Sequence, residues 1–390
     1  MPEAVDAPVI LSNEPGSFPR SVLAERHPAL ISKVRDAFPF EPGQHRALDA
    51  LLKSHTDGVI EPLGPDAHDH ASWENLGREY FGRSWFDVPF LWAESYFYRK
   101  LLDATGYFTP GPWQGVDPFR PFKQAELATD EAREEARALD TPALKPVEEQ
   151  RRALLHGSLW GNRADLGFQI QTGGGTGGDD TPLVADDSAA LWSLMPAGNT
   201  GAVCVVADNA GRELLPDLLL IDHLLRHRHT EHVVLQLKPY PYYVSDAMTA
   251  DVIDCLRFLR EADGVAGETG ERLWSLIGTG RLELRAHPFS CAPLPYAEMP
   301  DDLRREFAEA DLTVFKGDLN YRRLVGDRRW PPTTPFADVT AYFPSPVAAL
   351  RTLKSEVITG LDAGTEAALT AAHEQHWRTS GTHALIQVRA

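Results

Sequence analysis

The chain of 390 residues has little cysteine, a deficit of basic residues relative to acidic ones, and no long apolar run. Its three cysteines, Cys204, Cys255 and Cys291, lack metal-ligand spacing and stand among apolar neighbours, so we expect buried free thiols. The 38 basic residues against 56 acidic ones give a net charge of −18, which argues against a nucleic-acid-binding surface. An anionic small substrate stays compatible with this balance, because a local site can be positive within an acidic protein.

Signals for membranes or secretion are also missing. No apolar run is long enough to cross a bilayer, and the start of the chain lacks the apolar core of a signal peptide. We therefore expect a cytoplasmic protein without a membrane partner. The sequence leaves the oligomeric state open.

The first half of the chain has a helical pattern. Residues 1–20 are rich in proline, serine and glycine and predict an extended arm, and residues 21–195 form the predicted helical domain. Residues 88–105 carry aromatic side chains on most sides, so this helix should be buried nearly all round. Glu94 and Arg99 stand out on it, because a buried charge needs either an ion-pair partner or a ligand. Both interpretations stay open.

Two stretches of this half offer little chemistry. Residues 123–139 are charged on most sides and predict a single solvated helix. Residues 173–178, with the sequence GGGTGG, formally match a dinucleotide-binding glycine motif, but two aspartates, a threonine and a proline follow where a helix should open directly. A flexible loop is the better interpretation of this segment.

From residue 196 onward, strand-like and helix-like stretches alternate, which is typical of a parallel or mixed sheet with helices on both faces. The expected strands are 202–207, 232–237, 281–286, 311–316, 338–343 and 384–388, with an extended stretch near 348–353. The predicted fold class is α/β. We expect a three-layer α/β/α sandwich with a Rossmann-like, mostly parallel sheet in residues 196–390, preceded by the all-helical domain.

Polar side chains cluster after the expected strands of this second half. Asp208 and Asn209 follow the first strand and open a helix, where either one could serve merely as a helix cap. Ser245 and Asp246 come after the second strand. Two further clusters contain Lys316, Gly317, Asp318, Asn320, Tyr321 and Arg322, and then Arg351, Thr352 and Lys354. Because the carboxyl ends of parallel strands face one crevice, we expect these clusters to converge.

If these clusters converge, they bring side chains with oxygen ligands next to positively charged side chains. Asp208, Asn209 and Asp246 offer oxygen atoms, which suit a hard cation such as Mg²⁺ or Mn²⁺ better than Zn²⁺. The cations that could clamp a phosphoryl group are Lys316, Arg322 and Lys354. A water activated by the metal, or Asp208 itself, would then be the nucleophile. The alternative is a set of helix caps and surface ion pairs.

Several motifs together resemble those of the damage-control phosphatase family. They are ADNAGRELLPDLLL, KPYPYYVSD, FKGDLNYRRLVGDRRW and LRTLKSEVITGL, with a further likeness upstream in SWFDVPFLWAESYFYRKLL. The resemblance covers most of residues 80–360. It is to the branch with an RTxK motif, which also includes a protein reported as an acidic-residue (glutamate) methyltransferase. The resemblance implies an α/β/α sandwich with an added N-terminal helical domain.

The resemblance also implies roles for matching residues. Asp208, Asn209 and Asp246 would be the metal ligands and the catalytic residues. The implied contacts to the phosphorylated substrate are Asp318, Leu319, Asn320, Tyr321, Arg322 and Lys354, to which we add Lys316 and Glu94 as candidates. Arg99, Glu213 and Asp246 match positions assigned to S-adenosylmethionine in the methyltransferase description.

Three functions follow as hypotheses. The leading one is a phosphatase that depends on a divalent metal (Mn, Mg, Co or Ni) and hydrolyses a small phosphometabolite, with a sugar phosphate of the fructose 1-phosphate or fructose 6-phosphate type as first candidate. The second is methylation of a carboxylate with S-adenosylmethionine as cofactor, although no acidic-then-glycine-rich turn of the usual methyltransferase kind follows a clear strand. The third is a non-catalytic phosphometabolite-binding protein.

Overall fold

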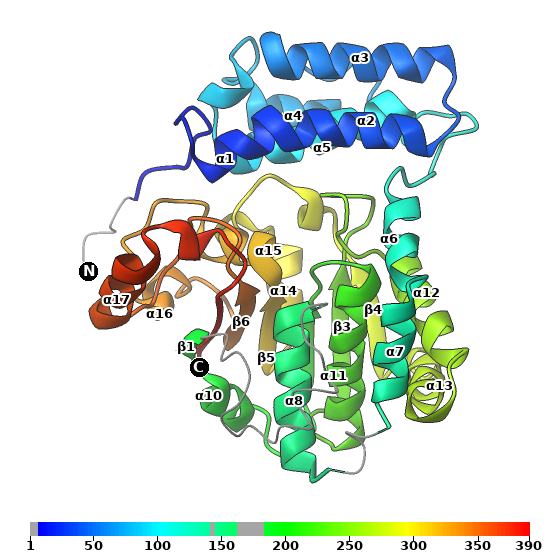
Figure 1. Ribbon diagram of the computed structural model, residues 1–390, viewed down its shortest axis with the longest axis vertical. Coiled ribbons are helices and arrows are strands. Elements are labelled where there is room, and N and C mark those ends of the chain that lie inside the picture. The colour runs from blue at the N-terminus through cyan, green and yellow to red at the C-terminus, as the bar shows by residue number, and fades with distance from the viewer. Residues whose placement is uncertain (1–6, 141–144, 162–182) are drawn as a thin grey trace.

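The computed structural model describes residues 7–140, 145–161 and 183–390, and the segment 173–178 lies outside these ranges. The N-terminal helices form a layer of their own above the rest of the molecule (Figure 1). These helices are α1 (Phe18–Ser21), a π-helical turn (Val22–Arg26), α2 (His27–Ala37), α3 (Pro42–Asp57), α4 (His70–Gly77) and α5 (Phe90–Thr105).

Helix α5 lies at the centre of this layer because its aromatic residues are buried on nearly every side, as the sequence predicted. The helix follows Pro89 and ends at Gly106, whose φ of 83° allows the left-handed cap that stops a helix. Its buried charges are paired. Glu94 contacts Arg322, and Arg99 contacts Asp69, so the ion-pair interpretation is confirmed for both.

The remaining elements form an α/β part. Its strands are β1 (Leu183–Asp186), β2 (Ala202–Val206), β3 (His232–Leu237), β4 (Leu282–Ala286), β5 (Leu312–Lys316), β6 (Val347–Thr352) and β7 (Ala384–Arg389). Its helices are α6 (Arg120–Leu127), α7 (Asp130–Ala138), α8 (Val147–Trp160), α10 (Ser188–Ser193), α11 (Leu214–Arg226), α12 (Thr249–Arg260), α13 (Gly264–Gly278), α14 (Asp301–Ala308), α15 (Gly317–Val325), α16 (Phe336–Val339) and α17 (Ala363–His373). Among the described residues, no helix has the length and apolar character needed to cross a bilayer.

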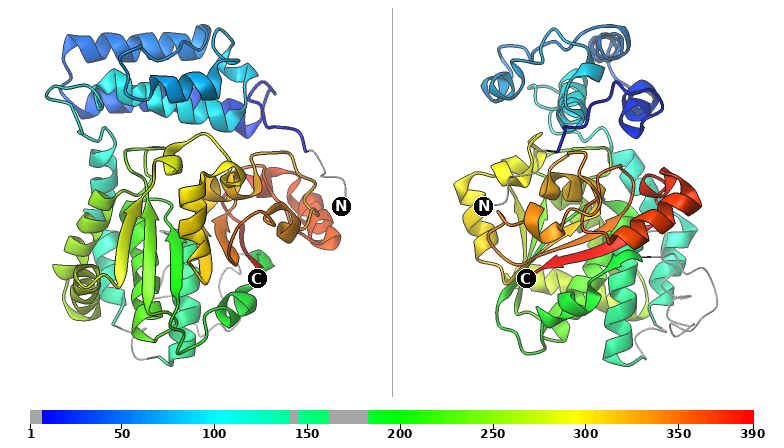
Figure 2. Two further views of the ribbon diagram at one scale, coloured as in Figure 1. Left: turned by 180° about the vertical axis from the view of Figure 1, so that it is seen from behind. Right: turned by 90° about the vertical axis from the view of Figure 1, so that its left-hand side faces the viewer.

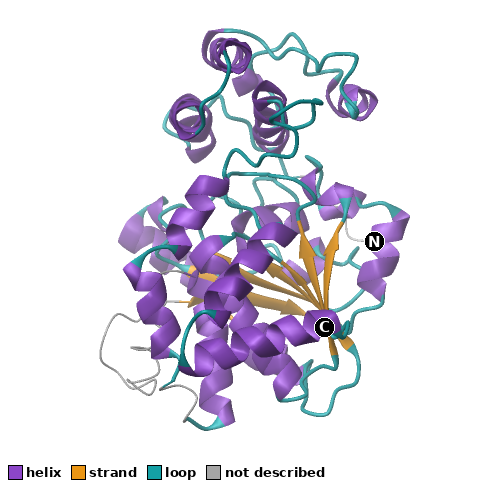
Figure 3. Cartoon of the chain, turned by 90° about the vertical axis from the view of Figure 1, so that its right-hand side faces the viewer, coloured by secondary structure: helices purple, strands orange, loops and turns teal. Residues whose placement is uncertain are grey.

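The sheet has the order β1-β7-β6-β5-β2-β3-β4. The run from β6 to β4 is parallel throughout, whereas β7 is antiparallel to β6 and parallel to β1. Helices flank the strands in Figure 3, which confirms the predicted mostly parallel α/β sandwich. Strands β2 and β5 are buried on both faces because apolar and β-branched residues fill them without alternation.

The two faces of the sheet pack into different apolar cores. In β2, Val203 and Val205 join the core with α11 and α12, whereas Cys204 and Val206 join the core that continues into the N-terminal helices. The helical layer and one face of the sheet therefore share a continuous core. All three cysteines are buried and free, as expected.

The carboxyl ends of the parallel strands point towards the helical layer (Figure 2). Strand β2 lies between β5 and β3, so the chain leaves β2 to one side and later returns to its other side. Open parallel sheets bind ligands at such a reversal of strand order, outside the carboxyl ends of the strands. The β2–β5 edge is therefore the place to look for a site.

Three stretches differ from the sequence prediction. The strand expected at 338–343 is wrong, because this segment holds the end of α16 and a turn, and Phe343 packs against the rings of Phe307 and Phe315 instead of pairing in the sheet. The single solvated helix expected at 123–139 is two helices, since the side chain of Thr129 caps a new helix by accepting from the amide of Ala132.

The third difference concerns the elements from α6 to α10, which the sequence interpretation grouped with the helical domain of residues 21–195. Helix α8 packs on α11 and β6, α7 packs on α13, and α6 contacts α12. Strand β1 pairs with β7 at the edge of the sheet. By their contacts, these elements belong with the α/β part.

Candidate active site

Strand β2 delivers Asp208 to the edge of the sheet. The strand ends at Val206, and the backbone carbonyl of Asp208 accepts a hydrogen bond of 2.9 Å from the amide of Ala247. An isolated β-bridge joins Asn209 to Asp246. These backbone contacts fasten the segment after β2 to the segment that carries Asp246, so the three predicted metal ligands lie together.

The amide side chain of Asn209 is held from both ends. Its nitrogen donates to Glu213 at 2.8 Å, and its oxygen accepts from the hydroxyl of Ser245 at 2.8 Å. Helix α11 begins directly after Glu213. Neither Asp208 nor Asn209 caps α11 with its side chain, so the helix-cap interpretation of this pair does not hold.

The segment before Asp246 has a strained backbone. Tyr243 and Val244 both have a φ of 44°, in the left-handed region that β-branched residues rarely adopt. Strain of this kind costs of order 1–3 kcal/mol per residue and persists where the surroundings enforce it, commonly at functional sites. Here it turns Ser245 and Asp246 towards the end of β2.

Asp246 is buried and lies beside two lysines. The amino group of Lys238 is 3.3 Å from its Oδ1, yet no donor meets hydrogen-bond geometry at this oxygen. Lys123 donates to the backbone carbonyl of Asp246 at 3.0 Å and also contacts Asp117 and Asp251. The Asp246 carboxylate therefore keeps one oxygen available within a fixed frame.

Strand β5 brings Gly317 against Asp208. A Cβ atom on Gly317 would lie 1.9 Å from the carboxylate carbon of Asp208, and the φ of Gly317 is +83°. Only glycine meets both demands, because it has no Cβ and tolerates the left-handed region. The close approach shows that β2 and β5 form one site.

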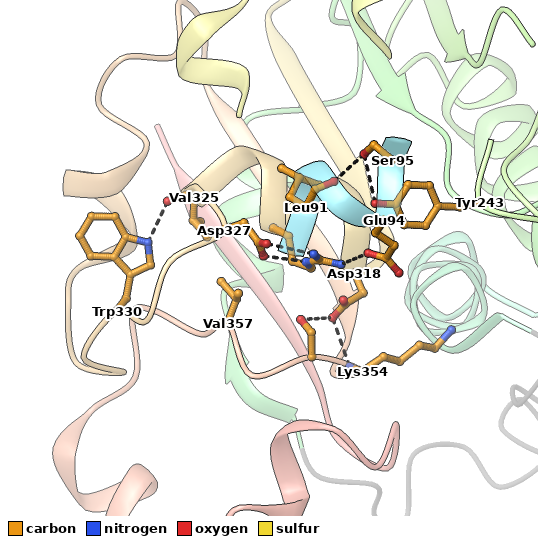
Figure 4. A network of polar contacts seen from close by, with 12 residues as sticks. Leu91, Glu94, Ser95, Tyr243, Asp318, Val325, Asp327, Trp330, Lys354 and Val357 are labelled. Carbon is orange, nitrogen blue, oxygen red and sulfur yellow. Dashed lines mark hydrogen bonds and ion pairs between the residues drawn. The ribbon is translucent and has the colours of Figure 1, made fainter. Parts of the chain in front are cut away.

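The next residue, Asp318, organises the turn after β6. Its Oδ1 accepts from Arg351 at 2.8 Å, from the amide of Lys354 at 3.2 Å and from Ser355 at 3.1 Å. Figure 4 shows Asp318 bonded at the base of Lys354, whose long side chain extends away from this network. The carboxylate of Asp318 thus positions the RTxK segment.

Other predicted residues are occupied elsewhere. Arg322 is saturated by Glu94 at 3.0 Å and by Asp327 at 2.7 Å, and it joins α15 to α5 of the helical layer. Figure 4 labels these two carboxylates. Asn320 donates to the carbonyls of Ala207 and Lys316 at 2.8 Å each. These contacts hold the backbone of the site in place.

Tyr321 and Arg99 point to other partners. The hydroxyl of Tyr321 bonds to Thr359 and Gln387, and Arg99 forms a bidentate contact with Asp69. Neither residue lines the two cavities at the strand ends. The family resemblance implied a binding role for both residues, but their side chains are bonded to these partners outside the two cavities.

Two cavities meet at Asp208. The smaller has a volume of about 40 Å³ and is lined by Asp208, Asn209, Glu213, Lys316 and Lys354, among others. The larger has a volume of about 610 Å³ and lies between the strand ends and the helical layer. Its lining includes Asp208, Asn209, Asp246, Asp318, Leu319, Arg322, Lys354 and Glu94.

Burial controls the electrostatics of the carboxylates. It raises the pKa of Asp208 to about 8, which Lys354 opposes and Glu213 reinforces. It also raises the pKa of Asp246 to about 6, against the effect of Lys238. The site thus holds several acidic groups that repel one another, which is the condition that a bound cation relieves.

Two further carboxylates differ in their surroundings. Burial acts to raise the pKa of Asp318, but the guanidinium of Arg351 holds it below its usual value. Burial raises the pKa of Asp217, whose Oδ1 lies 3.1 Å from the amino group of Lys316. Lys316 also donates to the backbone carbonyl of Ser158, so it links α8 to the end of β5.

The donor set fits a hard divalent cation. Asp208 has a raised pKa, Asp246 has a buried oxygen without a hydrogen bond, and Asn209 adds an amide oxygen next to both. Within the described part of the chain, no cluster of three His, Cys, Asp or Glu side chains is arranged to bind a metal by itself. A cation here would therefore need Asn209, water or a substrate oxygen as well as the two aspartates, as Mg²⁺-type sites usually do.

Sequence reasoning missed Lys123 and the conformations around Asp246 and Gly317. Lys123 was grouped with a solvated helix because its neighbours are charged, yet it is buried among Asp117, Asp251 and the backbone of Asp246. The sequence ATDE gives a capping signal at Thr129 that would have separated α6 from α7. No local signal marks the positive φ of Tyr243 and Val244.

The fold and the site define an α/β protein that gathers buried carboxylates and lysines where the strand order of its sheet reverses. Comparison with protein families matches residues 22–369 to the damage-control phosphatase ARMT1-like domain. The chain therefore belongs to this family.

Curated relatives match over almost the full chain. Damage-control phosphatase ARMT1 of Mus musculus is 29% identical over 438 residues, covering 98% of both chains. The protein of the same name from Macaca fascicularis is 30% identical over 432 residues, covering 95% of this chain and 96% of its own. A crystal structure of a DUF89 family protein from Pyrococcus horikoshii aligns with a TM-score of 0.47 and 15% identity, over 85% of this chain and 92% of that one.

Proposed function

We propose that the protein is a metal-dependent phosphatase that hydrolyses a small phosphorylated metabolite at the end of β2. The observation that carries this proposal is the joining of the half-buried Asp208 and the buried Asp246 with Asn209 beside a lysine-lined cavity. The relatives named as damage-control phosphatases support the same class of reaction.

Each group has a role under this proposal. Asp208, Asn209 and Asp246 would hold the divalent cation, which supplies Lewis-acid polarisation of the phosphoryl group when bound. Lys354 would bind phosphate oxygens from the turn that Asp318 fixes, and Lys316, which also lines the small cavity, would add positive charge. Gly317 allows the Asp208 carboxylate to reach this position.

The finer identity of the substrate is also part of the proposal. A sugar phosphate of the fructose 1-phosphate or fructose 6-phosphate type is the first candidate, since its hydroxyl groups can be recognised by the polar residues of the larger cavity, such as Ser245. Mn²⁺, Mg²⁺, Co²⁺ and Ni²⁺ are the candidate metals.

The contacts of the described residues do not favour S-adenosylmethionine-dependent methylation. The residues matched to that cofactor are divided, because Glu213 and Asp246 line the cavities whereas Arg99 is held by Asp69 outside them. The methyl donor would therefore lack its expected set of contacts in one place.

The test is phosphate release from a panel of phosphate esters with each metal. Wild-type protein should turn over at least one ester, and Asp208→Asn should lose this activity. A matched control is Asp222→Asn, which makes the same substitution at a buried aspartate that pairs with Arg272 outside both cavities. Absence of turnover with every metal, or equal activity in Asp208→Asn and wild type, would contradict the proposal. Metal-dependent binding of an unchanged ester would instead identify a non-catalytic binding protein.

A further inference from the structure

The larger cavity has a second wall that the phosphatase proposal does not use. Arg26, Ala29, Leu30 and Lys33 line it from the π-helical turn and α2 of the helical layer. Their spacing of three, four and seven residues places them on one face of a helix. This wall faces the strand ends that carry Asp208, because both line the same cavity.

The lining of the cavity also includes apolar and aromatic side chains. They are Phe18, Tyr98, Phe122, Val244 and Leu319. A ligand that fills the cavity would therefore meet apolar groups as well as the polar strand ends and the basic wall. The volume of about 610 Å³ falls within the range of roughly 300–1,000 Å³ that is usual for sites of drug-sized ligands.

The charges of the wall are not compensated by nearby acids. Neither Arg26 nor Lys33 forms an ion pair with a carboxylate among the residues that the structure describes. The guanidinium of Arg26 instead lies 5.1 Å from the centre of the Phe18 ring. By contrast, Arg322 in the same cavity is neutralised by two carboxylates.

These observations single out an anion as the ligand of the wall. The chain as a whole has a net charge of −18, so two uncompensated cations on one helical face make a local positive field in an otherwise acidic protein. Both residues are exposed and line the cavity, so they can bind an anionic group without first breaking an ion pair.

We infer that Arg26 and Lys33 bind a second anionic group of the substrate. The substrate class is then a phosphomonoester that carries a second phosphate or a carboxylate at its far end, such as a sugar bisphosphate, in place of the sugar monophosphate taken above as first candidate. This inference rests on the proposed function, which places the scissile phosphate at the opposite wall near Asp208 and Lys354.

The test compares α,ω-alkanediol bisphosphates of increasing chain length with the monophosphate of each diol. We expect wild-type protein to prefer one length of bisphosphate over its monophosphate by about tenfold or more in kcat/KM, as charge-assisted contacts typically give. The double variant Arg26→Ala/Lys33→Ala should lose this preference through KM and keep its rate with the monophosphate. The matched control, Arg46→Ala/Lys53→Ala, removes the same charge from exposed positions of α3 that do not line the cavity, and it should keep the preference.

Two outcomes would overturn the inference. One is a wild-type protein without any preference for a bisphosphate. The other is an equal loss with bisphosphates and monophosphates in the Arg26→Ala/Lys33→Ala variant, which would indicate general attraction of anions only. If no ester is turned over, the proposed function fails by itself, and calorimetric binding of the same probes to wild type and variant still decides whether the wall selects a second anion.

Discussion

The carboxylate of Asp208 should destabilise the metal-free protein at alkaline pH, and Asp208→Asn should remove this effect. The pKa of Asp208 is raised from 3.8 to about 8, so the folded protein holds the proton more tightly than the unfolded chain does. For an acid with a raised pKa, the free energy of unfolding is highest below the unfolded pKa and falls as pH rises towards the folded pKa. The loss therefore develops between about pH 4 and pH 8 and is complete above it.

The size of the effect follows from the same shift. A rise from 3.8 to about 8 corresponds to roughly 5–6 kcal/mol at 1.4 kcal/mol for each pH unit. Asp208 is only half-buried, because it lines both cavities, and water there screens part of its charge. We therefore expect the Asn variant to be about 2–3 kcal/mol more stable than wild type above pH 8, and to be similar near pH 4.

Urea denaturation in the presence of a chelator, followed at both pH values, measures this difference. Addition of Mg²⁺ or Mn²⁺ should then stabilise the wild type but not Asp208→Asn, because a ligand that binds only the folded state raises the free energy of unfolding. The control Asp222→Asn removes a carboxylate that Arg272 holds at 2.8 Å, so it should lose stability at both pH values. A stability difference between wild type and Asp208→Asn that does not change with pH would refute the reasoning.

Three further predictions concern neighbouring residues. Gly317→Ala should abolish phosphatase activity and lower the free energy of unfolding by at least about 1–2 kcal/mol. The control Gly326→Ala also has a positive φ, but its Cβ would lie 3.9 Å from the side chain of Arg328, so this variant should keep its activity. Equal activity of the two variants in a phosphate-release assay would contradict this prediction. Arg322→Met should lower the free energy of unfolding, measured by urea denaturation, by about 3–5 kcal/mol, because it leaves two buried carboxylates without their cation. A decrease under about 1 kcal/mol would show that these ion pairs do not stabilise the fold. Lys354→Met should raise KM for the phosphate ester about tenfold with little change in the melting temperature. The substitution should also raise the pKa of Asp208 in metal-free protein, since the charge of Lys354 lowers this pKa. An unchanged KM would show that Lys354 does not contact the substrate.

Much of the fold was readable from apolar patterns. Strands β2 and β5 are continuous apolar runs, and this pattern predicted their burial in a parallel sheet. The stretch at 338–343 has similar residues, but its apolar side chains fill a gap between aromatic rings. The apolar pattern alone cannot distinguish a strand from such a packed turn, because a strand must also find a free edge of a neighbouring strand to pair with. The edge of β5 is already paired with β6, so residues 338–343 cannot pair there.

The polar part of the site was less accessible from sequence. The topology brings the ends of parallel strands together, and this allowed Asp208, Asn209 and Asp246 to be grouped. From residue type alone, however, Tyr321 and Arg322 are equally suitable as ligand-binding residues. Their direction depends on the turn of α15, which buries both side chains against β7 and α5 respectively. The burial of Lys123 could not be predicted for a related reason, since two of its partners, Asp246 and Asp251, lie more than a hundred residues away along the chain.

The position of β7 constrains how the protein can be made. This strand is the last in chain order, yet it lies inside the sheet between β6 and β1, the first strand. Among the residues that the structure describes, β7 is the only strand that pairs with β1, so about two hundred residues must leave the ribosome before this pairing can form. Until then, the edges of β1 and β6 are exposed templates for pairing with other chains. A nascent chain that pauses before residue 384 would therefore need protection against pairing with other chains, whereas the completed sheet would not.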